Sequence, residues 1–139
     1  MPLWHHSVGS LVCSATTTYR SISKTLKYLA DIPPHPTLSI FSLQFPTTRA
    51  KIIQDFEEYI KQVTKVADPT GKRKIIAVID AINSRPGVLL PWKEMVGICR
   101  EARVISIVDG AHTLGQQLDI KLSEAQPDFY ISVCSVCSI

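Results

Sequence analysis

Asp109 is the residue of this sequence whose position most clearly requires a chemical role. It directly follows the apolar run 104–108, and His112 stands three residues further on. A carboxylate beside a buried strand is costly unless it has a partner. Three partners are open at this point: backbone amides of the following turn, a metal ion held together with His112, or a positively charged ligand atom. Two side chains are too few for a metal site, and a lone histidine is more often structural than catalytic.

The cysteines and the basic residues indicate no other site. Cys134 and Cys137 form a Cys-x-x-Cys pair with no second pair nearby, so neither zinc nor redox chemistry is expected. The basic run 71–74 is expected to be a solvated turn before a strand. The net charge is +3 and no long apolar run is present, so the sequence predicts neither nucleic-acid binding nor a membrane span. We expect a cytoplasmic protein.

A strand, a helix and a second strand are predicted around Asp109. The β-branched run 74–80 is typical of a strand buried on both faces. A loop at 83–87 leads to a helix that Pro91 is expected to open at its first position. The run 104–109 is the next strand, and a strand–helix–strand unit of this kind pairs its strands in parallel.

Other periodic segments extend this unit to a whole domain. They are possible strands at 11–14, 37–45 and 127–133, and amphipathic helices at about 19–30 and 47–66. The alternation of helices and strands predicts an α/β fold with three layers, α/β/α, and a mostly parallel sheet. Strand order cannot be read from the sequence. In such sheets ligands bind beyond the carboxyl ends of the strands, where Asp109 stands.

Several short motifs stand in a fixed order along the second half of the chain. They are Ser84-Arg85-Pro86-Gly87-Val88, Pro91-Trp92-Lys93-Glu94-Met95-Val96, Ile98-Cys99-Arg100-Glu101-Ala102, Val108-Asp109-Gly110-Ala111-His112 and Pro127-Asp128-Phe129. Together they resemble the large domain of class V, pyridoxal-phosphate-dependent aminotransferases, especially fungal isopenicillin N epimerase-like and cysteine desulfurase-like proteins. The resemblance covers residues 15–133, and the segments 1–14 and 134–139 diverge from it.

The resemblance implies a cofactor and residues that bind it. Asp109 takes the place of the aspartate that binds the pyridine nitrogen of pyridoxal 5'-phosphate. A carboxylate there favours the protonated ring, which then acts as an electron sink. The resemblance also implies that His112 lies near the phenolic oxygen of the cofactor, and that Asn83 and Ser84 contact the same oxygen. It implies an amino-acid substrate and a homodimer.

One departure from the family pattern concerns catalysis directly. The position of the lysine that forms the Schiff base is occupied by Val136, and no lysine follows Lys121. The resemblance therefore implies no catalytic residue in this chain, since the amine that links the cofactor and moves protons is missing. The small C-terminal domain of the family is missing as well. A truncated or mis-spliced gene product is favoured over a shortened protein with its own role.

Two functions follow as hypotheses. The first is a fragment of a pyridoxal-phosphate-dependent enzyme acting on amino acids, which is inactive as it stands. The second is a non-catalytic interaction module that binds a partner, such as a full-length paralogue, through a sheet edge or the helix 47–66. Because the sheet of a partial domain exposes edges and apolar side chains, we also expect a marginally stable, aggregation-prone chain in which Trp92 and the strand 129–133 lose their cover.

Overall fold

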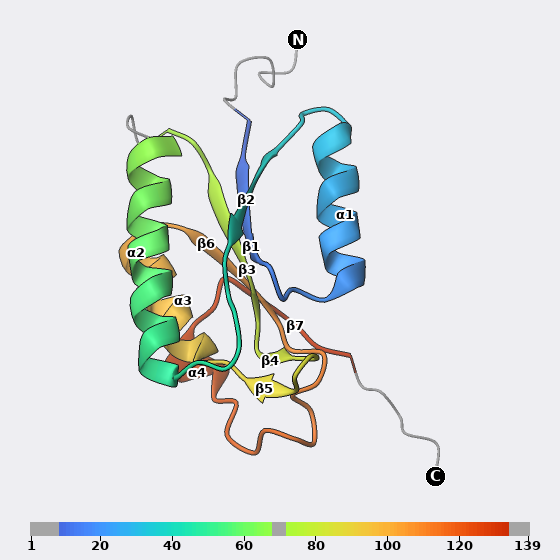
Figure 1. Cartoon of the computed structure of the whole chain (residues 1–139), viewed down its shortest axis with the longest axis vertical. Helices are drawn as coiled ribbons and strands as arrows, with labels where there is room; N and C mark the ends of the chain where they lie inside the picture. Colours follow the sequence, from blue (N-terminus) through green and yellow to red (C-terminus); the bar gives the residue numbers. More distant parts are fainter. Residues whose placement is uncertain (1–8, 68–71, 134–139) are drawn as a thin grey trace.

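The structure is a computed structural model that describes residues 9–67 and 72–133. Figure 1 shows the arrangement of its helices and strands. The described residues form, in chain order, β1 (Leu11–Ala15), α1 (Arg20–Asp31), β2 (Thr37–Phe41), α2 (Arg49–Ala67), β3 (Ile75–Asp80), β4 (Ile82–Asn83), β5 (Val88–Leu89), α3 (Trp92–Glu101), β6 (Ile105–Asp109), α4 (Leu122–Ala125) and β7 (Phe129–Ile131).

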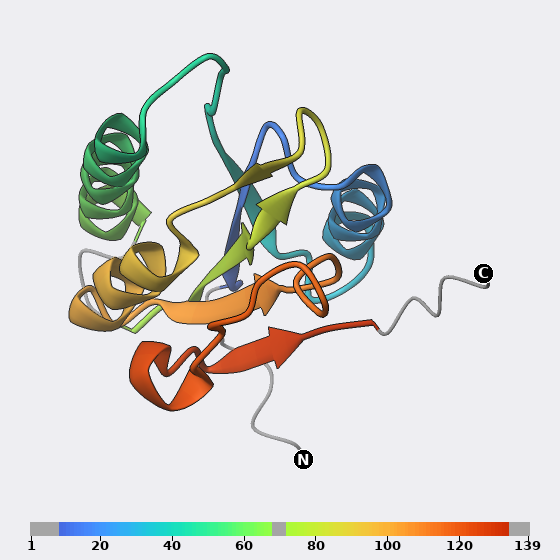
Figure 2. The ribbon, with the colours of Figure 1, turned by 90° about the horizontal axis from the view of Figure 1, so that it is seen from below.

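Five of these strands form one parallel sheet in the order β2-β1-β3-β6-β7. Seen from below, α1 lies on one side of the sheet and α2 and α3 lie on the other (Figure 2). The expected three-layer α/β/α fold with a parallel sheet is therefore confirmed. The short strands β4 and β5 pair antiparallel in a separate hairpin near the carboxyl ends of the sheet strands.

The face of the sheet under α2 and α3 carries the hydrophobic core. Cys13, Ala77, Ile79 and Val108 point to this face and are each at most 2% exposed. The core cluster joins them to side chains of α2 and α3, namely Ile52, Phe56, Ile60, Met95, Val96 and Cys99. The predicted spacing of Ile52, Phe56 and Ile60 thus correctly gave the buried side of α2.

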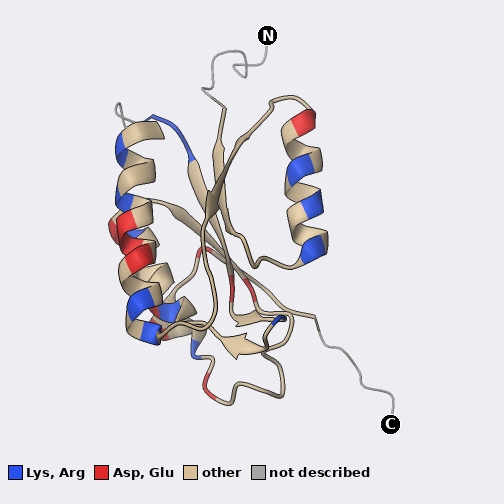
Figure 3. Ribbon diagram, in the orientation of Figure 1, with Lys and Arg blue, Asp and Glu red and all other residues tan. Residues whose placement is uncertain are grey.

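The opposite face is only partly covered, because α1 lies against one half of it. Register places Ile76, Ile105 and their neighbours along β3 and β6 on this face, where they are partly exposed. On the edge strand β7 and just after it, Phe129, Ile131 and Val133 are 59%, 58% and 58% exposed. We call the apolar side chains of β3, β6 and 129–133 on this side the open face. Charges gather on the helices, while most of the sheet is uncharged (Figure 3).

Several predicted boundaries differ from the structure. The strand expected at 37–45 ends at Phe41, because Leu43 N–H is bonded to the Thr16 hydroxyl rather than to a neighbouring strand. The segment 83–87, expected to be a loop, begins with Asn83, the last residue of β4, and continues as the turn of the β4–β5 hairpin. Pro91 is the N-cap of α3 rather than its first residue. The helix α4 was not predicted, since its four residues are too short for periodicity to be visible.

Trp92 was expected to lose its cover, and this expectation is wrong. Its side chain is 1% exposed and its ring centroid lies 5.7 Å from that of Tyr130. Its indole N–H donates a hydrogen bond to Gln117 Oε1 at 3.2 Å. The expectation for 129–133 is confirmed for Phe129, Ile131 and Val133, which are exposed, but not for Tyr130, whose ring packs against Trp92.

The basic run before β3 lies at the surface over its described residues as a bend rather than a turn, with Arg73 half-buried. Lys72 and Lys74 are exposed. The guanidinium of Arg73 donates hydrogen bonds of 2.6 Å to Gly9 O and of 2.6 Å to Thr37 Oγ1, so it ties the start of β2 to the segment before β1. Its role in the described part of the chain is structural.

Candidate functional site

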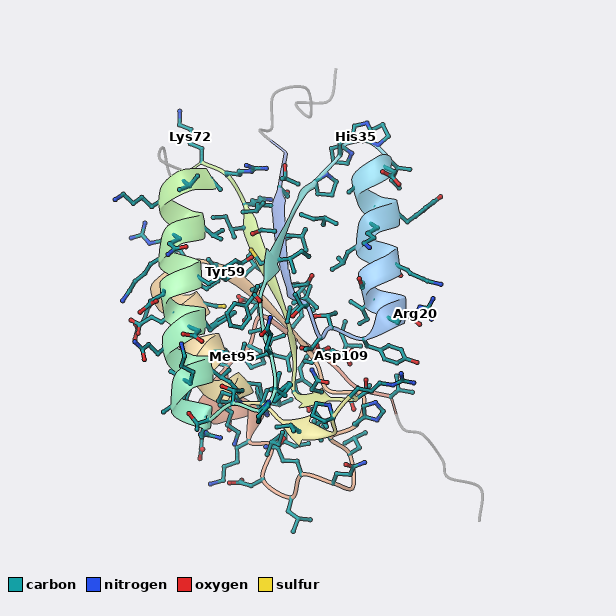
Figure 4. All side chains as sticks on the ribbon, in the orientation of Figure 1. Arg20, His35, Tyr59, Lys72, Met95 and Asp109 are labelled. Atoms are coloured by element: carbon teal, nitrogen blue, oxygen red, sulfur yellow. The ribbon has the colours of Figure 1, made fainter. Side chains whose placement is uncertain are left out.

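Asp109 ends β6 at the carboxyl edge of the sheet, as the sequence predicted. Figure 4 labels it at the end of the molecule where α1 begins with Arg20. Its Oδ1 accepts a hydrogen bond of 3.0 Å from the backbone N–H of Ala111. The turn-stabilising alternative is thus realised at one oxygen. This bond does not exclude a ligand, because a carboxylate has acceptor capacity at both oxygens.

A hollow of about 150 Å³ adjoins this carboxylate. It is lined by Tyr19, Asp80, Ile82, Ser84, Asp109, Ala111 and His112. These residues come from the turn after β1, from the end of β3 and the segment after it, and from the end of β6. The sheet topology therefore brings together side chains that are up to 93 positions apart, and the carboxyl ends of three parallel strands define the site.

Asp80 is the residue of the hollow that the sequence analysis missed. It ends β3 and is the register partner of Asp109, so the two carboxyl groups stand on neighbouring strands. Asp80 is only 5% exposed, and its Oδ2 is buried without a hydrogen-bond partner. The signal was present in the sequence, because Asp80 also follows a buried apolar run, but only the strand order shows that the two runs are adjacent.

The environment of Asp80 shifts its acidity. Burial raises the pKa of its carboxyl group to about 6, and the negative charge of Asp109 contributes in the same direction. The Thr18 hydroxyl and the Tyr19 backbone N–H oppose the shift by donating hydrogen bonds. One of two neighbouring carboxyl groups is therefore neutral in weakly acidic solution.

The other expected site residues are placed differently from one another. His112 is exposed and lines the hollow, as does Ser84. Asn83 does not line it: the side chain is 1% exposed and braces the hairpin turn. Its Oδ1 accepts a hydrogen bond of 2.9 Å from Arg85 N–H and its Nδ2 donates one of 3.4 Å to Thr17 O. Alternation along β4 explains the orientation of Asn83, since Ile82 lines the hollow and the next side chain points to the opposite side.

Gly110 fits the turn after Asp109 because nothing larger than hydrogen has room there. A Cβ at this position would lie 2.4 Å from the Tyr130 ring. The Tyr130 hydroxyl in turn is hydrogen-bonded to the buried Thr113 Oγ1. The close contact between Gly110 and Tyr130 fixes the path of the chain that carries Asp109 and His112.

A second, larger hollow of about 520 Å³ borders the first and shares Tyr19 and Ser84 with it. Basic and hydroxyl side chains line it, and no carboxylate does. The remaining lining residues are Thr17, Thr18, Arg20, Ser21, Lys24 and Arg85. The two hollows therefore have opposite charge, with the acidic one at the sheet end and the basic one around the first turn of α1.

Metal or thiol chemistry finds no support among the residues that the structure describes. Within 9–67 and 72–133, no group of three or more His, Cys, Asp or Glu side chains could hold a metal ion. Burial raises the pKa of the Cys99 thiol to about 12 and also raises that of Cys13, so neither is an activated nucleophile. The expected roles of Cys134, Cys137 and Val136 concern positions outside the described residues. No helix in the described ranges is long and apolar enough to cross a membrane.

Curated proteins resemble this chain over most of its length. The L-cysteine desulfhydrase-like protein lolT1 of Epichloe uncinata is 35% identical over 124 residues, which are 89% of this chain and 26% of that protein. The putative L-cysteine desulfhydrase 1 of Oryza sativa subsp. japonica is 39% identical over 129 residues, 91% of this chain and 25% of that protein. No family model matches the chain.

Solved structures share the fold at lower identity. The cystine C-S lyase C-DES, in complex with its product cysteine persulfide, has a TM-score of 0.70 and 17% identity over 92% of this chain and 32% of that one. The cysteine desulfurase CsdA of Escherichia coli has a TM-score of 0.66 and 13% identity over 92% of this chain and 29% of that one. A serine palmitoyltransferase variant from S. paucimobilis with a bound PLP-myriocin aldimine has a TM-score of 0.54 and 17% identity over 79% of this chain and 24% of that one.

The chain is a partial homologue of the PLP-dependent, class V aminotransferase-like family. Within that family its sequence is similar to L-cysteine desulfhydrases, and it shares the fold of the cysteine desulfurase CsdA. It spans about a quarter of the length of the curated relatives that it matches. The resemblance to the class V family read from the sequence motifs is thereby confirmed, whereas the likeness to isopenicillin N epimerases stays a prediction. The five-stranded parallel sheet corresponds to part of the family's PLP-dependent transferase fold.

Proposed function

We propose that the hollow between Asp80 and Asp109 is the PLP ring site of a cysteine desulfhydrase-like protein. One observation carries the proposal: two neighbouring carboxyl groups line a hollow at the carboxyl end of a parallel sheet, and one of their oxygens is buried without a partner. A buried unpaired acceptor is costly. A cationic N–H donor, such as a protonated pyridine nitrogen, would remove this cost.

The residues present fit the charge distribution of PLP. The acidic hollow suits the cationic ring nitrogen. The adjoining basic hollow, with Arg20, Lys24 and Arg85, suits an anionic substituent such as a phosphate or a substrate carboxylate. Both hollows share Tyr19, whose flat side chain suits contact with a ring. A ligand that is cationic at one end and anionic at the other matches the pair of hollows better than a neutral one does.

Each residue has a defined part in this proposal. PLP, when bound, supplies an electron sink for amino-acid chemistry. Asp109 favours protonation of the ring nitrogen through its charge, and its own orientation is fixed by the Ala111 N–H. His112 and Ser84 line the hollow from two sides and are placed to donate hydrogen bonds to a ring substituent. Asn83 acts on the site only by holding the β4–β5 turn that carries Ser84.

We infer that the whole protein of this kind acts on an amino acid, and that this chain does not turn it over. The support is the sequence: Val136 holds the position of the family's lysine. Without an amine there, cofactor binding is expected to be reversible, and no step can use that amine as a base. We propose a cytoplasmic location, and the two buried free thiols Cys13 and Cys99 agree with a reducing compartment.

Binding of pyridoxamine 5'-phosphate to the full chain tests the ring site. This probe carries the ring and phosphate of PLP but no aldehyde, so it does not react with surface lysines. We expect Asp109→Asn to weaken binding at least about tenfold, as for the loss of one charged hydrogen-bond partner. The matched control is Asp119→Asn, an exposed aspartate that does not line the hollow. Equal affinity of the Asp109 variant and the wild type, measured by titration calorimetry, would remove the assignment.

A second function is favoured by the open face. Contiguous exposed apolar side chains mark interaction surfaces in soluble proteins, and Phe129, Ile131 and Val133 form such a row. The helix α2, the other surface considered for a partner, turns its apolar side into the core and offers no equivalent. This function predicts a stable complex with a full-length paralogue and no response to pyridoxamine 5'-phosphate. Co-purification of the two chains, with and without Phe129→Lys, distinguishes it from the first.

A further inference from the structure

The two carboxyl groups of the acidic hollow are held in different ways. Asp109 is partly exposed and has an amide donor, the Ala111 N–H. Asp80 is 5% exposed; Thr18 and Tyr19 donate to its carboxyl group, but its Oδ2 has no donor. Asp80 is therefore the carboxyl group of the pair that is more deeply buried and less completely satisfied.

Among the described residues, no lysine or arginine lines the hollow with Asp80; Arg20, Lys24 and Arg85 line the adjoining basic hollow. The groups that line the hollow with it are Asp109 from β6, Tyr19 from the turn after β1, Ser84 from the hairpin and His112 from the turn after β6. Among them only Asp109 acts on Asp80 through its charge, and it repels the ionised form. Two carboxylates in one hollow cannot both ionise at low cost unless a cation joins them. Asp80 lines this hollow next to Asp109 and has an oxygen without a donor, so it is the residue that such a cation would satisfy.

We propose that Asp80 is the second carboxylate of the ring-binding site, and that it releases its proton to solvent when a cationic ring nitrogen binds beside Asp109. This inference rests on the proposed function and adds a residue to it. The charges balance. Below the pKa of Asp80, the ring cation takes the place of the proton that Asp80 releases, so the net charge of the site does not change on binding. Asp80 is a positioning residue, because it selects the charge of the ligand and performs no bond chemistry.

The sign of the resulting pH dependence follows from proton competition. Below the pKa of Asp80, about 6, a proton must be displaced before the cation gains the second carboxylate. The affinity for a cationic ring therefore falls as the pH falls, by at most about tenfold per pH unit. Above that pKa Asp80 is already ionised, and binding releases no proton from it.

Titration calorimetry with pyridoxamine 5'-phosphate tests this inference on the full chain. Measurements in two buffers of different ionisation enthalpy give the number of protons exchanged on binding. Because the ring nitrogen titrates in the same way with either protein, the difference between wild type and Asp80→Asn isolates the proton of Asp80. We expect a difference approaching about one proton at about pH 5 and near zero at about pH 8. Asp119→Asn is expected to match the wild type at both values.

The outcomes separate this inference from the proposed function. If Asp80→Asn binds with the same proton count and pH dependence as the wild type, the inference is wrong and the ring site stands. If the wild type binds no probe at any pH, both are wrong. If Asp80→Asn does not fold, carbon NMR of the wild-type carboxyl groups replaces it. Saturating probe must then lower the midpoint of the Asp80 titration, and an unchanged midpoint overturns the inference.

Discussion

The two faces of the five-stranded sheet differ in how completely they are covered. Under α2 and α3, side chains such as Ile79 and Val108 are at most 1% exposed and join a continuous core. On the other side α1 covers only the half around β1 and β2, and β7 lies at the edge of the sheet away from α1 (Figure 2). Its side chains Phe129 and Ile131, and Val133 just after it, are more than half exposed. The first face supplies the stability of the chain, while the second leaves apolar surface accessible.

The acidic hollow belongs to the incompletely covered side. Asp80 and Asp109 are on the same side of their strands as the open face, as their register and the alternation along each strand require. The packed face therefore holds the ends of β3 and β6 in place, whereas the partly uncovered face leaves room for a ligand beside them. A binding site needs both faces, because a fully packed face holds its side chains rigidly but leaves no space for a ligand.

Substituting one phenylalanine on each face gives the largest expected difference. Phe56 is 3% exposed in the core, and Phe129 is 59% exposed on the open face. We expect Phe56→Ala to lower the free energy of unfolding by about 3–5 kcal/mol. Phe129→Ala, the matched control, should change it by less than about 0.5 kcal/mol. Urea denaturation measures both, and similar losses would show that the open face is packed in solution.

Asp80→Asn is expected to stabilise the chain in a pH-dependent manner. The folded-state pKa of Asp80, about 6, lies above its ordinary value of 3.8, so the carboxyl group favours folding when protonated and disfavours it when ionised. The wild type therefore loses stability as the pH rises from about 4 to about 6. We expect the variant to be more stable by about 1–3 kcal/mol at about pH 8.

The low-pH measurement is the control for this prediction. Below about pH 4 both forms of the protein are neutral at position 80, so their unfolding free energies should converge. Asp119→Asn should show no comparable pH dependence, since Asp119 lies outside the hollow. A constant difference between wild type and Asp80→Asn at all pH values would contradict the assigned acidity.

Tyr59→Phe is expected to have a smaller effect on the packed side. The Tyr59 hydroxyl donates a hydrogen bond of 2.7 Å to Ser39 Oγ and lies near the buried Cys13 thiol. Burial raises the pKa of Tyr59. Removing the hydroxyl keeps the ring contacts with Phe41 and Phe56. We expect the free energy of unfolding, measured by thermal or urea denaturation, to fall by about 0.5–1.5 kcal/mol. No change would indicate that the hydroxyl is equally well satisfied by water.

Phe129→Lys is expected to leave folding nearly unchanged but to alter self-association. A lysine on an edge strand opposes pairing with another sheet and breaks the exposed apolar row. We predict a change in unfolding free energy below about 0.5 kcal/mol and a several-fold decrease in association. Sedimentation at increasing protein concentration measures it. Leu118→Lys is the control, because Leu118 is 100% exposed but lies outside the open face. Equal sedimentation of all three proteins would show that the open face does not drive association.

Much of the fold could be predicted from local patterns. The helix α2 and the strands β3 and β6 agree with their predicted ranges within one or two residues, because periodicity and β-branched runs report burial directly. The prediction failed where contacts with distant segments determine a strand boundary or the burial of a side chain. The end of β2 depends on a hydroxyl 27 residues away. The cover of Trp92 depends on Gln117 and Tyr130, which the chain brings back from a later segment.

The candidate site was predicted in part for the same reason. Asp109, His112 and Ser84 were identified from position and motif, and the structure places them in one hollow. Asp80 was overlooked and Asn83 was included, although only the former lines the hollow. Strand register and side-chain direction decide which of two residues near a strand end faces a ligand. Both depend on contacts with segments that are distant in the sequence.

The sequence by itself determined which segments are buried strands and helices, the family to which the motifs belong, and the carboxylate at the end of β6. These are properties of neighbouring residues, so local hydrophobicity and residue order suffice. The tertiary structure alone decided that β3 lies beside β6, that Asp80 therefore stands next to Asp109, and that one side of the sheet stays partly uncovered. Those features arise from contacts between distant segments, whose geometry is set by the packing of the whole sheet.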